Sequence, residues 1–200
     1  MQTQGTTANV ALVTKTKIFV ANVGDSRAIV NKNGKAMALS WDHKPSIPSE
    51  KERIIAAGHR VQMDRVDGGL AMSRALGDWQ YKSGKLPVKD MAVSSFPDVK
   101  TYQIEKDTKY LVLACDGIWD VMDNQLVLDF IEHGKLLQTA KAENKEAEFD
   151  YKKFHEKAGV RWREPEEIRE LMVDTMESSE YCGLSTLTEM MFEINCAPSV

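Results

Sequence analysis

The chain has 200 residues, of which 42% are hydrophobic and 28% are charged, and its formal net charge is -4. This composition suits one domain with a packed core, and the lack of a basic stripe argues against a nucleic-acid binder. No apolar run approaches the ~18 residues that a membrane span requires, and no secretory signal pattern opens the sequence. The three cysteines have no regular spacing, which favours free thiols. We therefore expect an intracellular protein, cytoplasmic or nuclear, that contacts neither nucleic acid nor membrane.

The first part of the chain predicts an antiparallel meander. Short apolar runs at 9–14 and 17–23 are typical of strands, and Gly24-Asp25-Ser26 interrupts the pattern. Two further runs, 27–31 and 35–39, flank Asn33-Gly34. This dipeptide favours a tight hairpin because both residues accept a positive φ.

A helix is expected next, over about 49–57. Ser49 and Glu52 have the spacing of a capping box, and Gly58 is placed to end the helix. Asp67-Gly68 then marks a turn.

Residues 109–115 predict a central strand with both faces covered, because the run is apolar after its first residue. Cys115, at its end, suits a small buried position. A second helix is expected after this strand, with Asp123 as its N-cap and Gly134 just beyond its end.

The composition changes near residue 138, where Lys and Glu become frequent. The pattern predicts an exposed helix over 140–157, a second from Pro165 to about Met176, and a last one over about 185–195.

Three acidic residues suggest a metal site. Asp116 and Asp120 flank a Gly-Ile-Trp turn after the central strand, and Asp42 lies in Trp-Asp-His-Lys-Pro. Carboxylates at strand ends are typical ligands of Mg²⁺ or Mn²⁺, and a metal-activated water is a nucleophile for phosphoester hydrolysis. The alternative is that these residues only form turns and helix caps. Asp25 and Asp67 are assigned to that alternative.

Arg74 and His43 each have two interpretations. Arg74 either holds a phosphate oxygen or forms a surface ion pair. His43 is either a general acid or base, or a hydrogen-bonded structural histidine.

Several motifs occur in a fixed order over residues 5–135, and together they resemble the metal-dependent serine/threonine protein phosphatases of type 2C. They are Gly-Thr-Thr-Ala (5–8), Val-Ala-Asn-Val-Gly-Asp-Ser-Arg-Ala (20–28), Asp-His-Lys-Pro (42–45), Glu-Lys-Glu-Arg-Ile (50–54), Ala-Gly (57–58), Leu-Ala-Met-Ser-Arg-Ala-Leu-Gly-Asp (70–78), Phe-Pro-Asp-Val (96–99) and Leu-Ala-Cys-Asp-Gly-Ile-Trp-Asp-Val-Met (113–122).

The resemblance implies an α+β fold in which two packed, largely antiparallel sheets are flanked by helices in four layers. It implies that Asp116 is a catalytic ligand of a two-metal centre. It further implies that Asp42 and Asp120 bind a third, weaker metal, and that Asp78 and Arg74 only frame the site. The implied substrates are phosphoproteins; the sequence does not indicate an oligomeric state.

The chain also departs from the family pattern. The metal-bridging Asp-Gly-His-Gly-Gly motif and the later Gly-x-Asp-Asn motif are not found in it. We therefore interpret residues 1–200 as one partial catalytic domain, with 138–180 as a variable helical insertion, and expect negligible activity from this stretch alone. Two alternatives stay open: a truncated or degenerate member that acts as a non-enzymatic binding or regulatory module, and a metal-sensing module.

Overall fold

The computed structural model describes residues 4–82, 85–132 and 191–193. The chain divides into two compact units, Met1–Asp120 with Met191–Val200, and Val121–Met190. The sheets, helix α1 and the candidate site belong to the first unit.

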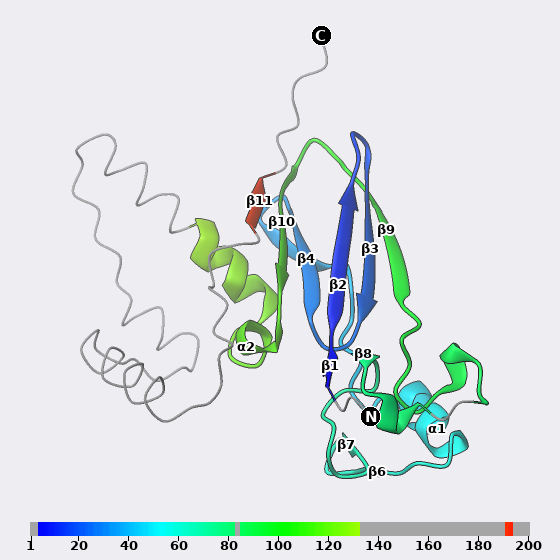
Figure 1. The fold of residues 1–200 in the computed structure, drawn as a ribbon. Coiled ribbons are helices and arrows are strands. Elements are labelled where there is room, and N and C mark those ends of the chain that lie inside the picture. The colour runs from blue at the N-terminus through cyan, green and yellow to red at the C-terminus, as the bar shows by residue number, and fades with distance from the viewer. Residues whose placement is uncertain (1–3, 83–84, 133–190, 194–200) are drawn as a thin grey trace. The chain divides into compact units, whose positions relative to one another are not determined.

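Two antiparallel sheets form the body of the first unit (Figure 1). One has the order β2-β3-β9, from Ala8–Val13, Lys17–Val23 and Asp98–Gln103. The other has the order β11-β10-β4-β5, from Met191–Glu193, Thr108–Ala114, Arg27–Lys32 and Lys35–Ala38. The four strands predicted in the meander are confirmed to within about a residue at each end, the usual uncertainty of such boundaries. Asn33 and Gly34 both have positive φ, as the hairpin requires.

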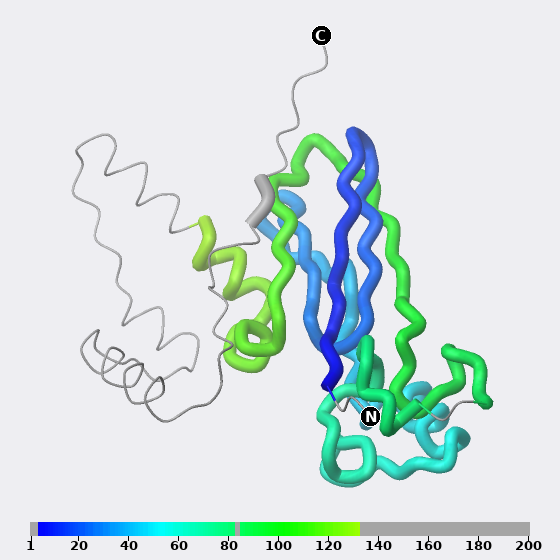
Figure 2. Tube along the Cα trace, in the orientation of Figure 1, coloured from blue at the N-terminus to red at the C-terminus, as the bar shows by residue number. Residues whose placement is uncertain are grey.

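A hydrophobic core joins the inner faces of the two sheets. It contains side chains from strands of both sheets, together with Leu39 directly after β5: Ile18, Val20, Ala28, Val30, Leu39, Tyr102 and Leu111. Figure 2 shows the strands of the two sheets running alongside each other, with the segment that holds α1 gathered at one end. The predicted α+β class with largely antiparallel sheets is therefore confirmed.

Helix α1 spans Pro48–Ala56, and the predicted capping box is wrong. The N-cap is Ile47, which makes no side-chain capping bond. Proline at the first helical position needs no amide partner and has a helical φ, so the helix begins before Ser49. Gly58 follows the helix end with a φ of 86°, as expected.

Short elements beside α1 were not predicted, because two or three residues carry no periodic signal. They are strand pairs β1–β8 (Gly5–Thr6, Leu76–Gly77) and β6–β7 (Val61–Gln62, Arg65–Val66), with short helices η1 (Trp79–Tyr81) and η2 (Val88–Asp90). A second hydrophobic cluster of Ile54, Val66, Ala75 and Val93 ties this segment to α1.

The predicted central strand is β10, and the short helix α2 (Asp116–Trp119) follows it. Cys115 between them is exposed, so the expectation of a buried residue is wrong. A further helix covers 124–132, and Asp123 caps it by accepting a hydrogen bond from the amide of Leu126 at 2.8 Å, as predicted.

The predicted helix over 185–195 is wrong at Met191–Glu193, which forms β11 and pairs with β10. The β10 edge opposite β4 offers unpaired backbone groups, and β11 satisfies some of them. Gly134 and the helices predicted over 140–157 and 165–176 lie outside the described residues. Within the parts that the structure describes, no helix has the length and apolarity to cross a membrane.

Candidate metal site

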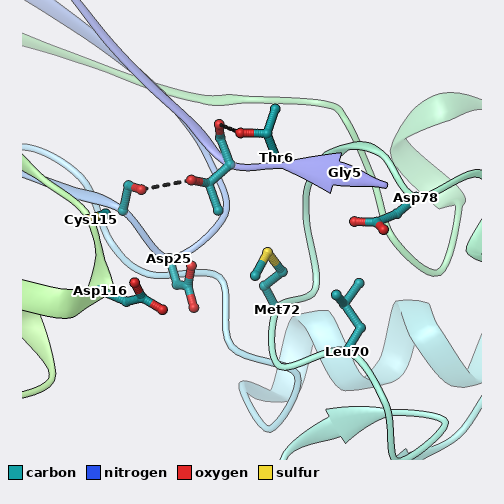
Figure 3. A pocket seen from close by; sticks show the side chains of 10 residues that line it. Gly5, Thr6, Asp25, Leu70, Met72, Asp78, Cys115 and Asp116 are labelled. Atoms are coloured by element: carbon teal, nitrogen blue, oxygen red, sulfur yellow. Dashed lines mark hydrogen bonds between the residues drawn. The ribbon is translucent and has the colours of Figure 1, made fainter. Parts of the chain in front are cut away.

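A pocket of about 290 Å³ lies where β1, the turn after β3 and the residues after β10 meet. Its lining combines carboxylates, hydroxyls and apolar side chains: Gly5, Thr6, Thr7, Asp25, Ser26, Leu70, Met72, Asp78, Cys115 and Asp116. Figure 3 shows the Asp25 and Asp116 carboxylates close together at one side of the pocket and Asp78 at the other, with Met72 between them.

The register of β10 and β4 explains why Asp116 and Asp25 line the same pocket. Ala114, the last residue of β10, pairs with Arg27, the first residue of β4. The turn before β4 therefore lies beside the residues that follow β10. Trp119 fixes the start of α2 there, because its indole N–H donates to the carbonyl of Ala114 at 2.7 Å.

The turn that bears Asp25 is tightly held. Gly24 has a φ of 112°, and a side chain at this position would overlap Thr7. The hydroxyls of Thr7 and Ser26 lie 2.8 Å apart in a hydrogen bond. Lys44 donates to the buried Asp25 carboxylate at 2.7 Å. Burial alone would lower the pKa of Lys44, but its bond to Asp25 outweighs this and raises the pKa.

The three predicted metal ligands have different surroundings. Asp116 is exposed and lines the pocket. Asp42 does not line the pocket. Arg27 donates to both of its carboxylate oxygens, from Nε to Oδ1 at 2.7 Å and from Nη2 to Oδ2 at 2.8 Å. The bond to Asp42 raises the pKa of Arg27 despite its partial burial. Asp120 is exposed at the end of α2, where its charge also acts on Arg27. In the described ranges, no three His, Cys, Asp or Glu side chains are grouped closely enough to hold a metal ion.

Two carboxylates that line the pocket, Asp25 and Asp78, were not among the metal-ligand candidates drawn from the sequence. Asp25 follows the end of β3 by two residues, just as Asp116 follows the end of β10 by two residues. This shared position after a strand could have marked Asp25 as a candidate from the sequence. Asp78 is buried at 6% exposure in a left-handed conformation with a φ of 50°. Burial raises the pKa of Asp78, and the charge of Lys82 only partly opposes this.

Arg74 belongs to a largely buried ion-pair network and not to the pocket. It donates to Glu50 at 2.7 Å, to Asp98 at 2.7 Å and to the carbonyl of Phe96. Glu50 also accepts from Ser73 and pairs with Arg53. The structure therefore favours the ion-pair interpretation of Arg74. The pair with Glu50 is buried, while Asp98, its second carboxylate partner, is 60% exposed.

The structure favours the structural interpretation of His43. The ring is 3% exposed, and both ring nitrogens are engaged: Nδ1 with the amide of Gly24 at 3.0 Å and Nε2 with Asp98 at 3.1 Å. Burial and the charge of Arg74 lower the pKa of His43, which favours the neutral form of the ring.

The sequence profile of protein phosphatase 2C matches residues 1–152 of this chain. The chain belongs to the protein phosphatase 2C family. A probable protein phosphatase 2C of Caenorhabditis elegans is 51% identical over 128 residues, which are 64% of this chain and 36% of the worm protein. The chain thus spans about a third of the length of that relative.

Two solved structures from Toxoplasma gondii have a similar fold. A phosphatase from a pathogenic strain is 32% identical with a TM-score of 0.54, over 71% of this chain and 42% of that one. A serine-threonine phosphatase 2C is 26% identical with a TM-score of 0.55, over 71% of this chain and 55% of that one.

Members of the protein phosphatase 2C family are metal-dependent, and the pocket suits a hard cation in ligand type. Asp25 and Asp116 offer carboxylates, and Thr6, Thr7 and Ser26 offer hydroxyls. Oxygen atoms of these kinds are the ligands that Mg²⁺ and Mn²⁺ prefer.

Proposed function

We propose that this chain is part of a protein phosphatase that removes phosphate from phosphoserine and phosphothreonine in protein substrates, with Mg²⁺ or Mn²⁺ as its metal. The observation that carries this proposal is that Asp25 and Asp116 line one pocket in a chain of the protein phosphatase 2C family. Carboxylates that share a pocket repel each other unless a cation or protons offset their charge. Lys44 offsets one charge through its bond to Asp25, and a divalent cation would offset the charge that Asp116 adds.

Asp116 and Asp25 would hold the metal in this proposal, with Asp120 as a ligand of a weaker accessory position. Asp42, which the resemblance also implies for that position, is left out of the proposal because Arg27 binds both of its oxygens outside the pocket lining. A bound divalent cation supplies a Lewis acid that activates water and offsets charge on the phosphoryl group. Thr6 and Thr7 contribute hydroxyls that can orient water or phosphoryl oxygens in the pocket. Lys44 holds Asp25 in place, and Arg27 keeps Asp42 as its counter-ion.

The described residues supply fewer grouped ligands than a pair of metal ions needs. We therefore expect weak metal binding and negligible phosphatase activity from these residues alone. The same observation favours a second candidate function, a non-enzymatic binding or regulatory module, with residues 138–180 as a partner-binding insertion in the catalytic domain.

Hydrolysis of a phosphothreonine peptide with Mn²⁺, measured as released phosphate on the full-length protein, tests the proposal. Asp116→Asn should lower kcat/KM by at least ~100-fold, because loss of a metal ligand costs several kcal/mol of transition-state stabilisation. Asp42→Asn is the matched control. It removes a partner of Arg27 outside the pocket, so the rate should fall by no more than about tenfold.

Equal rates for the two variants would contradict the role of Asp116. A full-length protein that neither hydrolyses the peptide nor binds Mn²⁺ in a calorimetric titration would favour the non-enzymatic module.

A further inference from the structure

We propose that His43 is a positioning residue, which holds the turn Gly24–Ser26 so that Asp25 faces the pocket. This inference rests on the proposed function for the use of Asp25 as a metal ligand. The hydrogen bonds that hold the turn do not depend on whether a metal binds.

His43 binds both backbone groups of Gly24. The amide of Gly24 donates to His43 Nδ1 at 3.0 Å, and the amide of His43 donates to the carbonyl of Gly24 at 3.0 Å. The first bond is buried, so the Gly24 amide has no water to replace a lost acceptor. Residue 24 is directly followed by Asp25, and any rotation at Gly24 therefore moves the Asp25 carboxylate.

The direction of these hydrogen bonds defines the tautomer of the ring. A backbone amide only donates, so Nδ1 must carry a lone pair. Nε2 then carries the proton and donates to Asp98 Oδ2 at 3.1 Å. Asp98 Oδ1 in turn accepts from Arg74 at 2.7 Å, and Arg74 is held by Glu50. The ring is thus fixed from both sides, as the partners of metal ligands often are.

The other contacts of the turn do not replace this one. Lys44 reaches Asp25 through a long side chain that is 29% exposed, and Thr7 holds Ser26, the residue after Asp25. Asn22 donates to the carbonyl of Gly24 at 3.0 Å. None of these contacts provides an acceptor for the Gly24 amide. Because the ring is buried and both its nitrogens are engaged, His43 has no free group for proton transfer to a substrate.

Two substitutions separate positioning from packing. In His43→Asn, the amide oxygen can take the place of Nδ1 and accept from Gly24, while the contact with Asp98 is lost. In His43→Gln, the longer side chain can donate to Asp98 in place of Nε2, but no acceptor remains at the Nδ1 position. Both variants lose the ring, so the loss of aromatic packing is shared. His59→Asn, which removes a ring that pairs with Asp67 outside the pocket, is the control.

The readouts are hydrogen exchange of the Gly24 amide by NMR and Mn²⁺ affinity from the EPR signal of free Mn²⁺, both on the full-length protein. His43→Gln should speed exchange of the Gly24 amide by about tenfold or more and weaken Mn²⁺ binding by roughly 10- to 100-fold. His43→Asn and His59→Asn should retain both properties.

Equal effects of His43→Asn and His43→Gln on Gly24 exchange would overturn the proposal. If exchange follows the expected pattern but no form binds Mn²⁺, the positioning of the turn stands and the proposed function fails. If a variant does not fold, the unmodified protein still provides a test. In its ¹⁵N NMR spectrum, His43 should carry a proton on Nε2 only. A proton on Nδ1 would refute the inference.

Discussion

Glu50 illustrates how a buried charge is stabilised in this chain. Its carboxylate is 3% exposed and is surrounded by Arg74, Arg53 and the hydroxyl of Ser73. Burial alone would raise the pKa of Glu50, but these partners outweigh it and lower the pKa from 4.5 to about 2. The ionised form is therefore the one that the fold stabilises, and the network joins α1 to the segment before β8.

This depressed pKa predicts acid sensitivity of the fold. The folded state favours ionised Glu50, so its contribution to stability is complete above the unfolded pKa of 4.5 and is lost as pH falls toward about 2. The loss should be on the order of 3 kcal/mol, from the size of the shift. Urea unfolding curves recorded between about pH 6 and pH 2 measure it.

Glu50→Gln should reduce the slope of stability with pH over this range. At neutral pH, the same variant should destabilise the fold by about 3–5 kcal/mol, because Arg74 and Arg53 lose a buried counter-charge. Glu105→Gln, which removes an exposed partner of Lys32, should cost less than about 1 kcal/mol and keep the slope. A Glu50→Gln protein with an unchanged pH profile would show that other carboxylates control the acid response.

At the scale of elements, local sequence predicted the strands whose alternation or apolar character is strong. β2, β3, β4 and β10 follow from such runs, and the β4–β5 hairpin follows from Asn33-Gly34. β9 was missed because Lys100 occupies an inward position. Its ammonium group bonds to the carbonyl of Ala38 and lies over Trp41, so a charged residue stands where the pattern expects an apolar one.

The candidate site was only partly predictable, because some of its residues are brought together by contacts between distant segments. Asp116 carries a local signal, since it directly follows an apolar strand. Asp25 lines the same pocket as Asp116, which lies about 90 positions later in the chain. The pairing of β10 with β4 brings the two segments together. β11 is likewise determined by the unpaired edge of β10, not by its own three residues. Both the position of Asp25 and the formation of β11 depend on contacts between segments that are distant in the chain. The pattern of a single sequence does not reveal such contacts.

The β1–β8 pair provides a prediction at this scale. Gly77 has a φ of 79°, and an added side chain there would overlap the carbonyl oxygen of Gln4. Gly77→Ala should therefore separate β1 from β8 and displace Gly5 and Asp78 from the pocket. We expect a loss of stability well above the ~1–2 kcal/mol that a left-handed alanine costs by itself, measured by thermal unfolding.

Gly34→Ala is the matched control for this change. Gly34 has nearly the same φ, 77°, but an added side chain there would meet no atom within 4 Å. This variant should show the backbone cost alone, about 1–2 kcal/mol. Equal destabilisation by the two substitutions would mean that the contact between β1 and β8 contributes little.

At the scale of the molecule, the first unit has an apolar sheet face that solvent reaches. Val10, Leu12 and Val99 are each more than 60% exposed. The register places Val10, Ala21 and Val99 in one row across β2, β3 and β9, so the apolar side chains form a continuous surface. Exposed patches of this kind promote association. We predict that the 200-residue chain self-associates as its concentration rises, which sedimentation velocity measures.

Val99→Lys should shift the chain toward the monomer, because a charge within this apolar row must be desolvated on association. Thr101→Lys adds the same charge on the same face of β9, one row away, where a polar residue already stands. It therefore controls for the change in net charge, and its effect should be clearly smaller. If the two variants shifted the equilibrium equally, general charge repulsion would explain the result, and the apolar row would have no special part in it. A wild-type chain that stays monomeric at high concentration would instead mean that the exposed face is too small, or too interrupted by polar neighbours, to drive association.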